Sequence, residues 1–423
     1  MKKYIFIASL AWVSLTTMAQ EPLSLSDFRG RVMDYSQSLK MSHQNVLASE
    51  SKFKMVRTGF YPSLAATAGG NYFIGNPGGK TFDLKDYAYN ANLTIQQNVY
   101  TGNAVSNQTK AARIELDIAQ MTMDQTVEQV LYGADVTYWA LAASTQQLAV
   151  TDKYVKIVEN LYRIVSDRFD DGYISRTDLL MVGTRLNEAK MQQITSRKFY
   201  QNSLQNLNSM LGQYEPHQYE VSDTISVPGS LPSFVTLEQA LSLRPEYLIA
   251  QRQVDLQNQN IRLARAKYNP QLVVGVQGVF GTKSINIDGE PVGYGVVFAN
   301  FKAPIFHWNE RRHDVARAKS GVRAAEYSLV DTRDAVGRDL STARISIEQS
   351  FDQAQVAKSN LLIAQENLEL NTYSYSEGRL PILDVLSAQL AWIQSYTAAV
   401  NANYQYKIAL SDYAKAMGQL SSK

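Results

Sequence analysis

Residues 87–99 read Tyr-Ala-Tyr-Asn-Ala-Asn-Leu-Thr-Ile-Gln-Gln-Asn-Val, with apolar side chains at most odd positions and polar ones at the even positions from 90 onward. A period of two over this length predicts a β-strand, over about 87–100, with one apolar and one polar face. The same alternation returns later in the chain and predicts a strand over about 293–306, with apolar residues at Val297, Ala299, Phe301, Ala303 and Ile305.

Each of these strands follows an earlier one, and the earlier strands are expected at about 63–73 and 271–282. Loops rich in Gly, Asn and Asp, at 75–80 and 287–291, connect the two strands of each pair into a hairpin. Four strands cannot enclose a water-filled lumen, because side chains fill even an eight-stranded barrel. Strand edges cannot be left open in lipid either. We therefore expect several copies to share one membrane barrel. Three copies would supply twelve strands, although the residues alone do not fix the number three. Polar faces lining a lumen make such an assembly a conduit.

Long proline-free stretches follow both hairpins. Helices are expected over about 103–170 and 309–376, and a helix over 103–170 would be about 100 Å long at about 1.5 Å per residue. Such a helix cannot fold back into a compact domain. Apolar residues spaced by three and four along it indicate a coiled-coil seam, although an ordinary amphipathic helix has the same local pattern; they are Leu131, Ala134, Tyr138, Leu141, Val155, Val158, Tyr162, Val165 and Phe169.

The chain is also duplicated. Matching residues lie 206 positions apart, namely Asn103 and Asn309, Gly172 and Gly378, Asp178 and Asp384, Leu180 and Leu386, Gly212 and Gly418, and Gln213 and Gln419. A single offset indicates an internal repeat. We expect a first repeat over 20–212, a proline-rich linker over 213–235, and a second repeat over 236–423. Each repeat reads helix, strand, strand, long helix and descending helix, the last over about 175–211 or 381–417. The predicted fold class is mainly α with a membrane β-barrel.

The first residues predict export. Lys2 and Lys3 precede an uncharged stretch that ends at Thr17-Met18-Ala19, so we expect residues 1–19 to be a signal peptide. We expect no transmembrane helix after it, since no later segment reaches the roughly 18 apolar residues that a span needs. The chain contains no Cys, which excludes disulfides and thiolate metal sites. Its net charge of +2 falls to zero without Lys2 and Lys3. A neutral chain lacks the excess of positive charge that favours binding to nucleic acid.

Two segments resemble the helical tips of the TolC family of outer-membrane efflux proteins. One is Arg168-Phe169-Asp170-Asp171-Gly172 followed by Thr177-Asp178-Leu179-Leu180, and the other is Tyr373-Ser374-Tyr375-Ser376-Glu377-Gly378 followed by residues 383–389. The resemblance covers essentially the whole mature chain. It implies a homotrimer in outer-membrane lipid, with a 12-strand barrel and a helical tunnel in the periplasm. The implied partners are a periplasmic adaptor (membrane fusion) protein and an inner-membrane RND or ABC transporter.

The resemblance also implies roles for single residues. Asp384 resembles the position whose carboxylates ring the periplasmic aperture, where three copies would favour cations and bind divalent metal; its alternative role is that of a first-turn acid favoured by the helix dipole. Ser387 stands where some relatives have a second aspartate, and Leu380 stands where some have a latch arginine. The aperture latch candidates are Tyr375, Thr177, Asp178 and Arg379. The expected tip turns and adaptor contacts are Asp171, Gly172, Tyr173, Glu377 and Gly378.

No catalytic, cofactor or resident metal site is expected. Gly79-Lys80-Thr81 lacks the earlier glycine of a phosphate loop, since the required position is Ile74, and the four histidines show no ligand spacing on a helix. The expected function is the outer-membrane exit duct of a tripartite efflux or type I secretion system. The alternatives are a passive porin, which would be nearly all strand, and a periplasmic coiled-coil scaffold without a pore, which has no use for alternating strands. The sequence does not indicate which cargo is exported, which class of pump is the partner, or whether the aperture rests open or closed.

Overall fold

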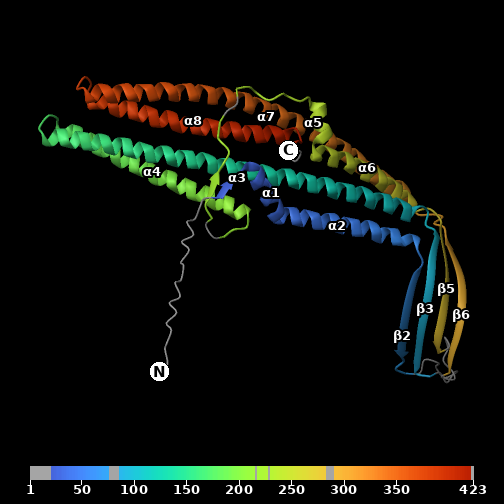
Figure 1. Cartoon of the computed structure of the whole chain (residues 1–423). Helices are drawn as coiled ribbons and strands as arrows, with labels where there is room; N and C mark the ends of the chain where they lie inside the picture. The colour runs from blue at the N-terminus through green and yellow to red at the C-terminus, as the bar shows by residue number, and fades with distance from the viewer. Residues whose placement is uncertain (1–20, 76–84, 215–216, 227–228, 283–289, 421–423) are drawn as a thin grey trace, which may run out of the picture. The chain divides into compact units, whose positions relative to one another are not determined.

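The computed structural model describes residues 21–75, 85–214, 217–226, 229–282 and 290–420. The expected signal peptide and most of both expected hairpin loops lie outside these residues. The described chain forms two compact units, each built from segments distant in sequence. One unit combines parts of Met1–Gln37, Val127–Val235 and Asp339–Lys423, and the other combines Ser38–Thr126 with Thr236–Arg338. The helices α3 (Ala104–Asp170) and α7 (Glu310–Ser376) each run through both units (Figure 1).

A four-stranded antiparallel sheet belongs to the second unit (Figure 1). Its order is β2-β3-β5-β6, so the two hairpins lie side by side through β3 and β5. The register places Ser63 opposite Gln96, Leu93 opposite Gly278, and Gln271 opposite Lys302. The strands are β2 (Ser63–Tyr72), β3 (Tyr87–Tyr100), β5 (Gln271–Thr282) and β6 (Pro291–Lys302).

The sheet is not packed into a protein core. Leu93 is 54% exposed and Val297 is 83% exposed, and the described residues of β2 are exposed throughout. Gly275 permits the close approach of β6, because a Cβ there would collide with the ring of Phe298 and with the carbonyl oxygen of Ile95. Apolar side chains on a sheet this exposed require a cover that a single chain does not provide.

The end of the last strand differs from the expectation. The alternating pattern continues to Ile305, but β6 ends at Lys302. Pro304 explains the difference, because proline has no backbone N–H to donate to a strand ladder. Residues 303–307 are neither strand nor helix, and α7 begins at Glu310.

Asn103 and Asn309, which occupy equivalent positions in the two repeats, share a backbone conformation that favours asparagine. Each immediately precedes a long helix and has a positive φ, of 69° at Asn103 and 65° at Asn309. Asparagine tolerates this left-handed conformation better than most residues with a Cβ. The remaining helices of this unit are α2 (Gln37–Arg57), whose first residue belongs to the other unit, the short η1 (Thr58–Phe60), α5 (Leu237–Leu243) and α6 (Pro245–Ala266).

The first unit consists largely of two helical hairpins, in which α3 is followed by α4 (Arg176–Met210) and α7 by α8 (Ile382–Ala416). It also contains α1 (Leu25–Tyr35) and a parallel pairing of β1 (Glu21–Leu23) with β4 (Tyr219–Val221). Its core includes the predicted seam, with Ala134, Tyr138, Leu141, Val158 and Val165 all fully buried.

A buried ionic contact holds α1 to this core. The guanidinium of Arg29 donates to both carboxylate oxygens of Asp135, at 2.7 Å each, and Ser411 Oγ donates to the same carboxylate at 2.7 Å. The side chain of Asp135 is only 1% exposed. In the described part of the chain, no helix is both long and apolar enough to cross a membrane.

Candidate aperture site at the helical tips

The first tip turn, between α3 and α4, closes on a glycine. Gly172 has a φ of 77°, its N–H donates to the carbonyl of Phe169 at 2.9 Å, and the N–H of Tyr173 donates to the carbonyl of Arg168 at 2.8 Å. This pair of bonds is the Schellman motif, which satisfies the last carbonyls of a helix and favours glycine at the left-handed position. Tyr173 itself is 81% exposed.

The second tip turn repeats this geometry. Gly378 has a φ of 71°, its N–H donates to the carbonyl of Tyr375 at 3.0 Å, and the N–H of Arg379 donates to the carbonyl of Ser374 at 2.9 Å. Gly212 and Gly418 end α4 and α8 in the same way. The glycines of the 206-residue repeat therefore all serve to end helices.

Asp178 is occupied within its own turn. Ser175 Oγ accepts from the N–H of Asp178 at 3.2 Å, and the Asp178 carboxylate accepts from the Ser175 hydroxyl at 2.9 Å and from the Ser175 N–H at 3.3 Å. This capping box begins α4. In this conformation the Asp178 carboxylate bonds within the turn, which leaves its latch role as a proposal.

Asp384 stands in the first turn of α8, and its N–H donates to the carbonyl of Pro381 at 3.2 Å. Its side chain is exposed, and its carboxylate has no hydrogen-bond or ion-pair partner among the described residues. Ser387 lies one turn later and is also exposed, with its hydroxyl donating to the carbonyl of Leu383 at 2.8 Å. The exposed polar groups of this turn therefore combine one free carboxylate with one hydroxyl that bonds to its own helix.

Tyr375 takes part in the contact between the two tips. Its ring is 7% exposed and packs in an apolar cluster with Val165 of α3 and Val385 of α8. The guanidinium of Arg168 lies 5.0 Å from the centre of this ring, and its Nη2 donates to the carbonyl of Ser376 at 3.2 Å. Arg168 thus forms a cation–π contact and also bonds a free carbonyl at the end of α7.

The sequence interpretation did not assign Arg168 a role, although it stands in the tip motif. A cation in the last turn of a long helix was the available signal. Thr177 and Arg379 are exposed, and no hydrogen bond or ion pair links them to Tyr375 within the described part of one chain. Asp171, Gly172, Glu377 and Gly378 are exposed as well, so the backbone and side chains of both turns are accessible.

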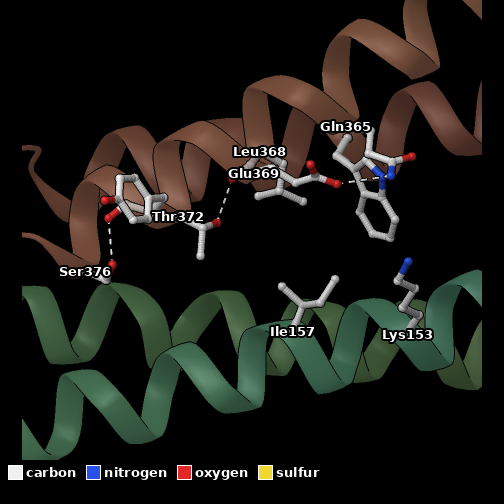
Figure 2. A pocket seen from close by; sticks show the side chains of 9 residues that line it. Lys153, Ile157, Gln365, Leu368, Glu369, Thr372 and Ser376 are labelled. Carbon is white, nitrogen blue, oxygen red and sulfur yellow. Dashed lines mark hydrogen bonds between the residues drawn. The ribbon is translucent and has the colours of Figure 1, made fainter.

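A groove of about 500 Å³ lies beside the tips, between α3 and α7 (Figure 2). Figure 2 shows Lys153 and Ile157 on one wall and Gln365, Leu368 and Thr372 on the other. Lys153 Nζ lies 5.6 Å from the centre of the Trp392 ring, which forms part of the lining. The groove is mainly apolar, and the charged residues of its lining are Lys153 and Glu369. Within the described residues, no cluster of His, Asp and Glu could hold a metal ion in one chain.

Comparisons with known proteins agree on one family. A family model described as "Outer membrane efflux protein" matches residues 31–213 and 236–419. The outer membrane protein TolC of Escherichia coli (strain K12) is 22% identical over 421 residues, which cover 95% of this chain and 84% of that protein. The structure of CusC superposes with a TM-score of 0.80 at 16% identity, over 93% of this chain and 92% of that one. The Campylobacter jejuni CmeC outer membrane channel superposes with a TM-score of 0.79 at 18% identity, over 93% and 85%.

Proposed function

This chain belongs to the outer membrane efflux protein family, and from that premise we propose that three copies form one duct, fed by a periplasmic adaptor and an inner-membrane pump. The protein is an outer-membrane exit channel with its helical part in the periplasm, and it is not an enzyme. We further propose that the system is a tripartite efflux or type I secretion system and that the pump is an RND or ABC transporter.

The open sheet carries the proposal. Within the described chain β2 and β6 each pair with one strand only, so each has a free edge. Within lipid, no water is available to hydrogen-bond the backbone N–H and C=O groups of such an edge, and each unsatisfied backbone group costs several kcal/mol. Pairing β6 of one copy with β2 of the next removes both edges. Twelve strands then close a barrel wide enough for a lumen.

Exposed apolar residues on the helices support the same assembly. On α7, Val356 is 69% exposed and Ile363 is 64% exposed, and on α4, Ile194 is 62% exposed. Singly exposed apolar residues are common on protein surfaces, but a series of them along a coiled-coil helix is what a neighbouring copy would cover. The tips, where Tyr173 stands free, are proposed as the adaptor contact, together with Asp171, Gly172, Glu377 and Gly378.

Asp384 is proposed to form the aperture ring. Its exposed carboxylate is free to face the axis of a trimer, where three like charges would attract cations and bind divalent metal. Ser387 adds no charge, so the ring would consist of a single layer. Tyr375, Thr177, Asp178 and Arg379 remain the proposed latch, to which the structure adds Arg168 as a proposed member through its contact with Tyr375.

Planar-bilayer recording of the purified full-length protein tests the proposal. We expect small, cation-selective openings that micromolar to millimolar divalent cations block from the side of the tips. Asp384→Asn should weaken that block at least tenfold. The matched control is Glu326→Gln, which removes the same charge from an exposed position of α7 in the other unit. Divalent block that is unaltered in Asp384→Asn would refute the ring, and an unchanged bilayer current with the wild-type protein would refute the duct.

A further inference from the structure

A basic groove lies in the second unit, where the strand-to-helix junction after β6 meets α6. It has a volume of about 600 Å³ and is lined by Asn309, two small apolar side chains and four cations. The cations are Arg265 of α6 and Arg311, Arg312 and Lys319 of α7. Positions 312 and 319 lie about two turns apart on the same face of the helix, and position 311 lies roughly 100° around the helix from 312.

These four cations differ from their neighbours in having no acidic partner. Lys267 Nζ bonds Glu310 at 2.8 Å, and Arg317 bonds Asp314 at 2.8 Å, which uses the two nearby carboxylates of α7. These contacts lower the pKa of Glu310 and of Asp314, chiefly through the hydrogen bonds from Lys267 and Arg317. No hydrogen bond or ion pair with an acid is present for the four groove cations among the described residues, and no acid lines the groove. The groove is therefore an uncompensated positive site.

Exposed aromatic and aliphatic side chains lie next to this site in the chain. Ile305 is 95% exposed, Phe306 67% and Trp308 85%, and the rings of Phe306 and Trp308 meet edge to face at 4.9 Å between centroids. They stand between the end of β6 and the start of α7, which is the boundary between barrel and periplasmic helix. Aromatic residues followed by cations are the arrangement expected at the headgroup level of a membrane.

We propose that the groove binds the headgroup of an anionic phospholipid from the periplasmic leaflet of the outer membrane. Guanidinium groups bind phosphate through paired, charge-assisted hydrogen bonds, and the exposed Ile305, Phe306 and Trp308 meet the acyl chains. The charge and the adjacent apolar side chains favour a lipid over a soluble anion, since a soluble anion uses only the cations. The bound lipid would fix the depth at which the barrel sits in the membrane.

Binding of a fluorescent phosphatidylglycerol to the detergent-solubilised full-length protein tests this site, with phosphatidylcholine as the zwitterionic comparison. The variant Arg311→Gln/Arg312→Gln should weaken phosphatidylglycerol binding about 30-fold, at about fivefold for each cation near the headgroup. The matched control Arg323→Gln/Arg333→Gln removes two charges from exposed positions of the same helix outside the groove and should change binding less than threefold.

Two further measurements distinguish a bound lipid headgroup from a free phosphate ion, and the second of them needs only the wild-type protein. Inorganic phosphate at 10 mM should displace little of the lipid; complete displacement would overturn the lipid assignment in favour of a free anion. With the wild-type protein alone, 0.5 M NaCl should abolish the preference for phosphatidylglycerol over phosphatidylcholine. A preference that persists in high salt, or equal loss of binding in both double variants, would overturn the proposal.

Discussion

Replacing Arg168 by Gln should loosen the end of α7. The change removes the cation–π contact with Tyr375 at 5.0 Å and the hydrogen bond to the Ser376 carbonyl at 3.2 Å. Because the Arg168 side chain is only partly buried, its cation–π contact is taken to contribute about 0.5–1 kcal/mol, and a net hydrogen bond about 0.5–1.5 kcal/mol. The sum, about 1–2.5 kcal/mol in each chain, corresponds to a roughly 5- to 70-fold larger population of the opened turn.

Hydrogen exchange of the backbone amides measures this population. The relevant N–H groups belong to Glu377, Gly378 and Arg379, which donate to the carbonyls of Tyr373, Tyr375 and Ser374. In Arg168→Gln they should exchange roughly 5- to 70-fold faster, because local opening exposes them to solvent. The control Arg163→Gln removes the same charge from an exposed side chain of α3, five residues before Arg168.

A coupled variant separates the two parts of the contact. In a Tyr375→Leu background the cation–π contact is already lost, so Arg168→Gln should accelerate exchange by a smaller factor, near that of the hydrogen bond alone. Equal exchange in Arg168→Gln and Arg163→Gln would refute the reasoning. The consequence for the duct is more frequent opening if the latch proposal holds.

Three other predictions follow from buried or strained groups. Asp135→Ala should lower unfolding stability by about 3 kcal/mol, because it leaves Arg29 without its partner, and Arg29→Met/Asp135→Leu should recover at least half of that loss in thermal denaturation. Gly378→Ala should lower the free energy of unfolding by about 1–2 kcal/mol from its positive φ alone, since a Cβ there meets no atom within 4 Å. Gly212→Ala should lower it more, because its Cβ would collide with a tyrosine ring. Thermal unfolding of both variants measures the difference. Burial lowers the pKa of Lys407, so the charged lysine disfavours the folded state, and this cost disappears as pH rises toward 10.5. Lys407→Met should therefore differ from the wild type in its pH dependence, with the difference in free energy of unfolding changing between neutral pH and pH 10.5; a difference that is constant with pH contradicts the assignment.

Several parts of the fold could be read from local patterns. The period-two pattern of residues 87–99 corresponds to β3, and the glycines at 172 and 378 mark helix ends because the Schellman motif needs a residue tolerant of positive φ. The pattern misplaced the end of β6 because side-chain alternation continues past Pro304 whereas the hydrogen-bond ladder cannot.

Contacts between residues that are distant in the sequence could not be predicted from local patterns. Arg168 meets Tyr375 across 207 positions, and the residue that matches Arg168 in the second repeat is Ser374, so the duplication carries no trace of the contact. The carboxylate of Asp135 collects donors from α1 and α8, which no local periodicity brings together. The basic groove likewise needs the fold to place Arg265 beside Arg311 and Arg312.

The central claim is that one chain cannot seal its own barrel wall, and the mass of the detergent-extracted protein tests it most directly. Native mass spectrometry should give three times the mass of the single mature chain, with the complex persisting on dilution. A stable single chain of no more than 47.3 kDa that shows no affinity for lipid would contradict the account.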